Sequence, residues 1–293
     1  MSLDLAPRQR AMLKEMGVKV WWPAAEVAVP VAPPPAVAAV VTPEFIATVA
    51  HPTSSKSSFD TENTLEKHPA VAQVSAPRPP AAPFIAPLTS HLAAQLDWPA
   101  LQDAVANCQA CGLCESRKNT VFGVGQAPTD PALAPQVDWL IVGEAPGENE
   151  DLQGEPFVGQ AGKLLDNMLK ALGLNRTRQV YIANVLKCRP PHNRNPAPAE
   201  IAQCAPYLQR QIELLQPKII LALGRFAVQT VLADSVPQVA TIALGKLRGQ
   251  VYAYHGVPVV VSYHPAYLLR SLPDKAKAWA DLCLAQSVVQ KAG

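Results

Sequence analysis

Three short apolar runs in the sequence are each followed by residues that can take part in acid–base or hydrogen-bond chemistry. The run at 137–143 leads into Glu144 and an acidic turn, GEAPGENED. The run that starts at 180 leads to Asn184, and the run at 257–263 leads to His264. A carboxylate can activate water or stabilise positive charge, and an amide can both donate and accept hydrogen bonds. An imidazole can stabilise a negative charge that develops during a reaction.

The elements around these residues alternate between apolar runs and segments with helical spacing. The sequence predicts strands at 137–143, 180–186 and 218–224, with a further pair of strands within 250–265. It predicts helices at 91–106, 159–174, 196–217, 225–232 and 273–290. This alternation indicates an α/β fold, a three-layer α/β/α sandwich around a short, mostly parallel sheet. Ligands bind such sheets beyond the carboxyl ends of the strands, which is where the polar residues lie.

Four cysteines form a second candidate site. Cys108 and Cys111 have the spacing of a pair that grips one metal ion or one cluster, and Cys188 and Cys204 follow on a distant segment. Together they predict a four-thiolate site that joins the N-terminal part of the globular region to the sheet. The spacing alone does not choose between zinc and a 4Fe–4S cluster, and buried thiols that bind nothing are the structural alternative.

Two further cysteines do not fit that pattern. Cys114 continues a series with Cys108 and Cys111 that resembles part of a ferredoxin run, but the fourth ferredoxin cysteine is missing nearby. We therefore expect Cys114 and Cys283 to be small buried residues.

Composition narrows the classes of protein that remain. The formal net charge of +2 is too small for a protein that coats nucleic acid, so any contact with DNA must come from a local patch. The sequence has no run of 18 apolar residues and no apolar signal core at its start, so we expect no membrane association and a cytoplasmic location. In that reducing compartment, six cysteines favour metal or redox chemistry over disulfides.

The first 88 residues differ from the rest. Segment 24–88 contains much of the sequence's proline, with alanine, valine and serine, and we expect a disordered linker there. Segment 1–23 could form a short amphipathic helix followed by two tryptophans, and it is a candidate docking peptide for a protein partner. A helix that folds back on the domain is the alternative. We expect residues 89–293 to form the catalytic domain.

Five separated signatures occur in order: the spaced cysteines, GEAPGENED, GEPFVGQAG, ANVLKCRPP and HPAYLLR. Together they resemble the family 4 uracil-DNA glycosylases, from about residue 108 to about residue 270. The resemblance implies an α/β/α fold and hydrolysis of deoxyuridine in single- or double-stranded DNA. It also implies a structural 4Fe–4S cluster on Cys108, Cys111, Cys188 and Cys204.

The resemblance implies roles for the residues of the uracil pocket. Phe157 is expected to stack on a flipped uracil, and Asn184 to match its O4 and N3–H. His264 is expected to hydrogen-bond to O2, and Glu144 to position water or stabilise the sugar cation. Other uracil glycosylases have an aspartate where Ala145 stands, which leaves the water-activating group less defined. Glu150 is expected to help exclude thymine, a task of a tyrosine at the position of Gly147 in those enzymes.

The remaining assignments concern DNA. Leu268 is expected to wedge into the gap left by the flipped base, with Leu269 as the weaker choice. The basic residues expected to grip phosphates are Arg189, Lys246, Arg248 and Arg270. Because the loop CRPPHNRNP is short and holds one histidine, His192, we expect turnover and not a covalent adduct with DNA.

Two other hypotheses stay open at this point. A non-catalytic iron–sulfur module that binds DNA or senses damage would use the same pocket without cutting. An interaction scaffold around the proline-rich segment explains the first 90 residues but not the motifs. We expect the protein to act as a monomer on uracil-containing DNA.

Overall fold

The structure is a computed structural model, and it describes residues 93–128 and 137–291. The predicted docking segment at 1–23 and the predicted linker at 24–88 lie outside the described residues. The first residues of the predicted domain, 89–92, lie outside them too.

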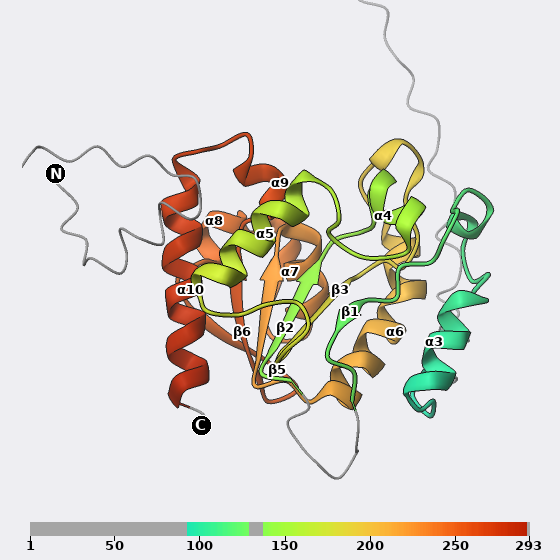
Figure 1. The fold of residues 1–293 in the computed structure, drawn as a ribbon, viewed down its shortest axis with the longest axis horizontal. Helices are drawn as coiled ribbons and strands as arrows, with labels where there is room; N and C mark the ends of the chain where they lie inside the picture. The colour runs from blue at the N-terminus through green and yellow to red at the C-terminus, as the bar shows by residue number, and fades with distance from the viewer. Residues whose placement is uncertain (1–92, 129–136, 292–293) are drawn as a thin grey trace, which may run out of the picture. The chain divides into compact units, whose positions relative to one another are not determined.

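A six-stranded sheet forms the centre of the described fold (Figure 1). Its order is β1-β3-β2-β4-β6-β5. The inner strands β3, β2, β4 and β6 are parallel to one another, while β1 and β5 pair antiparallel at the two edges. The strands are β1 (Val124–Gly125), β2 (Trp139–Gly143), β3 (Val180–Asn184), β4 (Ile219–Leu223), β5 (Val251–Tyr254) and β6 (Val257–Ser262). The predicted mostly parallel sheet is confirmed, and the two-residue strand β1 is an addition.

Helices cover both faces of this sheet (Figure 1). They are α3 (Trp98–Ala106), α4 (Glu148–Gln153), α5 (Gln160–Ala171), α6 (Pro198–Leu215), α7 (Arg225–Val231), α8 (Leu244–Leu247), α9 (Pro265–Leu268) and α10 (Asp274–Lys291). Short 3-10 turns lie at Gly112–Glu115, Pro191–Asn193 and Val239–Thr241. The first predicted helix starts seven residues late, at Trp98, because the Asp97 side chain accepts a hydrogen bond from the Ala100 amide and caps the helix there.

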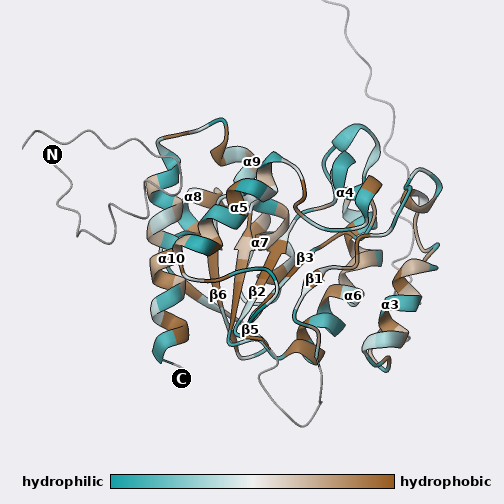
Figure 2. Ribbon diagram, in the orientation of Figure 1, coloured by the Kyte–Doolittle hydropathy of each residue, from teal (hydrophilic) through white to brown (hydrophobic). Residues whose placement is uncertain are grey.

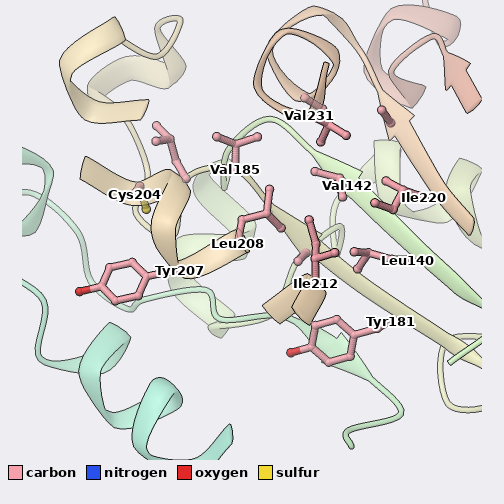
Figure 3. Packing of buried hydrophobic residues seen from close by; sticks show 14 of the residues in the cluster. Leu140, Val142, Tyr181, Val185, Cys204, Tyr207, Leu208, Ile212, Ile220 and Val231 are labelled. Carbon is pink, nitrogen blue, oxygen red and sulfur yellow. The ribbon is translucent and has the colours of Figure 1, made fainter. Parts of the chain in front are cut away.

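The inner strands are apolar throughout because both of their faces are buried. In β2, Leu140 and Val142 pack in a cluster with α6 and α7, while Trp139 and Ile141 pack in a second cluster with α5 and α10. Figure 3 shows Leu208 and Ile212 of α6 close to the side chains of the first cluster. Figure 2 shows the same division by hydropathy, with hydrophobic strands inside and hydrophilic helix faces outside. No helix in the described ranges is long and apolar enough to span a membrane.

The parallel register brings the ends of the inner strands together. Gly143 at the end of β2 pairs with Asn184 at the end of β3, and Leu223 of β4 pairs with Ser262 of β6. The residues that follow these strands, including Glu144 and His264, therefore share one edge of the sheet. The sheet thus places all three polar side chains predicted to be chemically active at one site.

Candidate active site and cysteine pocket

A cleft of about 530 Å³ opens at the carboxyl ends of the inner strands. That volume lies in the range of about 300–1,000 Å³ that ligand sites occupy. All six residues predicted for catalysis and uracil binding line it: Glu144, Ala145, Glu150, Phe157, Asn184 and His264. Arg270, predicted to contact DNA, lines it as well. The structure therefore brings the predicted pocket together, and the roles of its residues stay predictions.

Asn184 is the most unusual residue of the cleft. Its side chain is 2% exposed, yet its Oδ1 atom has no hydrogen-bond partner. Among the described residues, one other buried side-chain atom, Trp279 Nε1, shares this condition. Buried polar groups are normally paired, and an unpaired one costs about 1–3 kcal/mol. An acceptor kept unpaired at the wall of a cleft is suited to a ligand that brings a donor.

Gly143 makes room for this amide. A Cβ atom at position 143 would lie 2.3 Å from Asn184 Oδ1 and 2.6 Å from Phe157 Cζ. Both contacts are shorter than real Cβ contacts, so any side chain at Gly143 would displace the two groups. The absence of a side chain at the end of β2 is therefore a requirement of the cleft.

Phe157 lies in a backbone conformation that few non-glycine residues adopt. Its φ angle is 56°, and its carbonyl lies so close to Gly162 that a Cβ there would overlap it. Arg176 donates hydrogen bonds to the carbonyls of Pro156 and Phe157 and holds the turn in place. The Phe157 ring stacks with the His264 ring, with centroids 5.4 Å apart and planes at 27°. Backbone strain of this kind is found at functional sites, where surrounding contacts maintain it.

Glu150 joins the two loops that form one wall of the cleft. Its Oε2 accepts a hydrogen bond from the Gly147 amide, and its Oε1 accepts from the amides of Val158 and Gly159. A Cβ at position 147 would lie 2.7 Å from Oε2 and would push the carboxylate away. Glu150 thus keeps the acidic turn and the Phe157 turn together, and this arrangement needs glycine at 147.

The hydrogen bonding of His264 defines which of its nitrogens carries the proton. Its Nδ1 accepts from the Ala266 amide at 3.2 Å, as the N-cap of α9. The neutral ring must then carry its proton on Nε2. Burial lowers the pKa of His264 to about 4, so the neutral form persists through the physiological range. His264 is therefore a neutral hydrogen-bond donor and not a cation.

Burial raises the pKa of Glu144 above its ordinary value, while the positive charge of Arg225 opposes that shift. A carboxylate with a raised pKa is a stronger base toward water. Arg225, at the start of α7, was not predicted for the site. The signal for it was available, because Gly224 ends the apolar run of β4 and Arg225 follows at the same sheet edge.

Three of the predicted DNA-contacting residues have side chains positioned at the surface. Arg270 and Lys246 are exposed, and Arg270 also lines the cleft. Arg189 is partly buried and lies 3.6 Å from Glu148, and it donates to Asn193 Oδ1. Arg194, which was not predicted, lines the cleft beside Asn193 and pairs through both guanidinium nitrogens with Glu200. Nothing in the local sequence distinguishes Arg194 from its neighbours.

Two residues predicted to contact DNA have other contacts in the free protein, and their roles at DNA stay predictions. Leu268 is 0% exposed and packs in the core with α5 and α10, so it is not placed to enter DNA. The single turn of α9 directs it inward and leaves Leu269 43% exposed. Arg248 forms a paired contact with the buried carboxylate of Asp281, at 2.7 and 3.0 Å, instead of facing phosphate.

The four predicted cysteine ligands line one small pocket between α3, the turn at Gly112–Glu115 and α6. Arg117 donates to Cys188 Sγ at 3.2 Å and to the Cys108 carbonyl at 2.8 Å. The Lys187 amide donates to Cys204 Sγ at 3.2 Å. The Tyr207 side chain is another wall of this pocket. Figure 3 shows Tyr207 and Cys204 on α6. The sequence-distant cysteines are thus brought to one place.

The environment of these thiols disfavours their ionised form in the free protein. Burial raises the pKa of Cys111 and Cys188, and it raises that of Cys204 to about 12. Thiolates in this pocket would therefore need positive charge to form. Within the described residues, no group of three or more His, Cys, Asp or Glu side chains is arranged around a single metal ion. Cys114 and Cys283, predicted to be buried, are both partly exposed.

The fold and the cleft define an α/β enzyme class with its site at the carboxyl ends of parallel strands. Residues 131–283 match the model of the uracil DNA glycosylase superfamily. The chain is 44% identical to a type-4 uracil-DNA glycosylase of Archaeoglobus fulgidus over 169 residues, which cover 56% of this chain and 79% of the relative. It is 38% identical to the type-4 enzyme of Thermotoga maritima over 196 residues, covering 66% of this chain and 95% of the relative.

A type-5 uracil-DNA glycosylase of Pyrobaculum aerophilum is more distant, at 31% identity over 188 residues, which cover 56% of this chain and 80% of the relative. The chain therefore belongs to the uracil DNA glycosylase superfamily, and within it to the type-4 family.

Proposed function

We propose that this protein hydrolyses the N-glycosidic bond of deoxyuridine in DNA, which releases uracil and leaves an abasic site for base excision repair. The observation that carries the proposal is the unpartnered, buried Oδ1 of Asn184 in a cleft that Phe157 and His264 also line. Uracil has a donor, N3–H, that fits this acceptor.

Recognition begins with a base that has left its stack. Extrusion costs a few kcal/mol, and the Phe157 ring offers an apolar face to the extruded base. Asn184 Oδ1 accepts from N3–H, and its Nδ2 donates to O4. Cytosine presents an acceptor at N3 and leaves Oδ1 unpaired, which costs about 1–3 kcal/mol. Glu150, held in place by three backbone amides, limits the space near the base 5-position.

The bond that breaks joins N1 of uracil to C1′ of the sugar. Its electron pair moves onto the base, and the negative charge reaches O2, where the Nε2–H of His264 donates a hydrogen bond. Water adds to C1′ on the face opposite the departing base and transfers a proton to the Glu144 carboxylate. Burial of Glu144 raises its pKa and thus its basicity for this step.

The cysteine pocket fits a 4Fe–4S cluster on Cys108, Cys111, Cys188 and Cys204. A cluster binds each thiolate at a different iron, whereas zinc draws all four sulfurs to about 2.3 Å from one ion. The four cysteines line one pocket and together supply the four thiolates that a 4Fe–4S cluster needs. Cys108 and Cys111 after α3, Cys188 after β3 and Cys204 on α6 would hold the cluster, which would supply a covalent link between these segments.

The residues proposed to contact DNA are chosen by the exposure of their side chains. Arg270, Arg189 and Lys246 are proposed to contact phosphates, and Leu269 replaces Leu268 as the proposed wedge. The protein is proposed to act as a monomer in the cytoplasm, with a possible protein partner for residues 1–23.

A labelled single-stranded oligonucleotide with one uracil, treated with alkali after incubation, tests the proposal directly. We expect strand breaks at uracil, and none with cytosine or thymine at the same position. Asn184→Asp should abolish activity on uracil or move it toward cytosine, and Glu144→Ala should slow cleavage with little loss of binding. Binding without release by cluster-loaded protein would contradict the proposal and favour a non-catalytic DNA-binding module.

The same reactions test for turnover. His192 is exposed on the short turn at Pro191–Asn193. We expect multiple turnovers and no stable protein–DNA adduct on denaturing gels. A persistent adduct on uracil-containing DNA would show that the short loop does trap the sugar.

A further inference from the structure

Exposed apolar side chains gather next to the cleft. Tyr267 is 39% exposed, Leu269 43% and Leu272 62%, and they are three of the five large hydrophobic residues exposed in the described chain. All three lie within six residues, immediately after His264. Clustered apolar exposure of this kind marks a binding surface on a folded protein. Tyr267 lines the cleft itself, so whatever fills the cleft also contacts its ring.

The Tyr267 ring is held in place in the free protein. Its hydroxyl donates to Asp274 Oδ2 at 2.5 Å, and Ser271 Oγ donates to the same oxygen at 2.8 Å. Hydrogen bonds from Lys277, Tyr267 and Ser271 together hold the pKa of Asp274 well below its ordinary value. The acceptor therefore stays ionised, and the polar end of the ring is already paired. What remains for a ligand is the aromatic surface.

A second aromatic ring supports the first. Tyr263 lies with its centroid 5.0 Å from that of Tyr267, at an interplanar angle of 38°. The Arg248 guanidinium lies 4.5 Å from the Tyr263 centroid and is fixed by Asp281. Ser262 also donates to Asp281, which anchors this group of side chains to the end of β6. Arg248 thus supports an aromatic pair in the free protein.

We propose that Tyr267 is a stacking platform for a nucleobase beside the extruded uracil in the same DNA strand. The inference rests on the proposed function and adds a contact that the reaction itself does not need. Tyr267 and Arg270 line the same cleft, so an aromatic surface and a cation for the adjoining phosphate lie together. Stacking tolerates every base, because each has a π-face, and it suits an unpaired strand whose flanking bases are accessible.

The test combines protein variants with DNA that lacks one base. Tyr267→Ala, Tyr267→Leu and Tyr267→Phe are compared with the unchanged protein on single strands that carry one uracil. Three strands are used: one with normal neighbours, one with an abasic residue on the 5′ side, and one with it on the 3′ side. Single-turnover uracil release gives the rate and the half-saturating protein concentration. A 2-aminopurine neighbour reports stacking through its fluorescence, and melting temperatures verify folding.

We expect Tyr267→Ala and Tyr267→Leu to raise the half-saturating concentration about tenfold on the normal strand, with Tyr267→Phe near the unchanged protein. On the strand whose contacted neighbour is already missing, the same variants should add almost no further loss. Quenching of 2-aminopurine should be lost with Ala and Leu. Equal losses on all three strands, or none on any, would overturn the inference. If the unchanged protein releases no uracil, the proposed function fails, while the quenching assay still measures stacking.

Discussion

The cleft and the cysteine pocket meet in one loop, yet their side chains are organised in opposite ways. Asn184 faces the cleft and Cys188, four residues later, faces the cysteine pocket. The cleft keeps a buried acceptor without a partner, whereas sulfur atoms of the cysteine pocket already accept hydrogen bonds from Arg117 and the Lys187 amide. Unsatisfied groups cost stability and await a ligand, while satisfied groups hold the fold. Substitutions in the cysteine pocket should therefore lower stability, whereas substitutions in the cleft should lower activity.

The largest effect is expected in the cysteine pocket. Cys204→Ala removes a proposed cluster ligand, and loss of a metal ligand belongs to the few single changes that cost more than about 4 kcal/mol. We expect cluster absorbance to vanish, the melting temperature to fall sharply and activity to disappear with the fold. Visible absorption and thermal unfolding of anaerobically purified protein provide the measurement.

Cys283→Ala is the matched control, because Cys283 packs at the edge of the other core cluster, against α5 and the sheet. It should keep the cluster spectrum and shift the melting temperature little. A Cys204→Ala protein that retains full visible absorbance would show that the pocket does not hold the cluster.

The next largest effect is expected for a substitution in the cleft. It should lower activity without lowering stability. Asn184→Ala removes both hydrogen bonds to uracil, and we expect kcat/KM to fall about 100-fold. Because Oδ1 is unpaired in the free protein, the free energy of unfolding should stay unchanged or increase. Urea denaturation beside single-turnover kinetics separates the two. A loss of stability as large as the loss of activity would contradict the idea that the cleft, unlike the cysteine pocket, serves activity alone.

Lys187 lies between Asn184 of the cleft and Cys188 of the cysteine pocket. Its substitution should therefore affect both stability and activity. Its side chain is 1% exposed, and its ammonium donates to the Asn184 carbonyl at 2.9 Å and to Gln211 Oε1 at 2.6 Å. Lys187→Met leaves these acceptors unpaired, so we expect a loss of about 2 kcal/mol in stability and a higher KM for uracil DNA. Lys218→Met, at the partly exposed pair with Asp138, is the control and should change neither by much. A change in stability with an unaltered KM would mean that the loop does not transmit the effect to Asn184.

The pH dependence of stability tests the state of His264. The folded protein binds this proton less readily than the unfolded chain, since burial lowers the pKa from 6.5 to about 4. Its contribution to stability is therefore fully present above about pH 6.5 and is lost as pH falls toward 4. Relative to His264→Gln, the unchanged protein should lose about 2 kcal/mol between pH 7 and pH 5. Urea unfolding at both pH values measures it, and a parallel pH dependence of the two proteins would contradict the neutral state of the His264 ring.

Much of this arrangement could be predicted because it depends on periodicity and on strand ends. The apolar runs of β2, β3 and β4 are continuous because both faces are buried, so their carboxyl ends located Glu144 and Asn184 correctly. The direction in which side chains point from a single helical turn could not be predicted in this way. Leu268 and Leu269 have the same chemistry, and the turn of α9 alone decides which is buried.

Pairing between distant charges was equally hidden from the sequence. Arg248 is a basic residue next to a glycine, which is typical of a phosphate contact, but its partner Asp281 lies on α10, 33 residues away. Arg194 similarly depends on Glu200 at the start of α6. Hydrogen bonds of this kind depend on how helices and loops pack together, and no local sequence pattern predicts them.

The smallest effect concerns the rim of the cleft, where charge acts through solvent. Arg270 is exposed, lines the cleft and should contact one phosphate. Each contact of this kind adds about 0.7 to the slope of log affinity against log salt for a single strand. Arg270→Ala should reduce that slope by roughly this amount, weaken binding a few-fold and leave both stability and the rate at saturation unchanged. Lys291→Ala, at the far end of α10, should leave the slope as it is. If Arg270→Ala instead lowered the saturated rate at every salt concentration, Arg270 would act on the reacting nucleotide and the rim would belong to the catalytic part of the cleft.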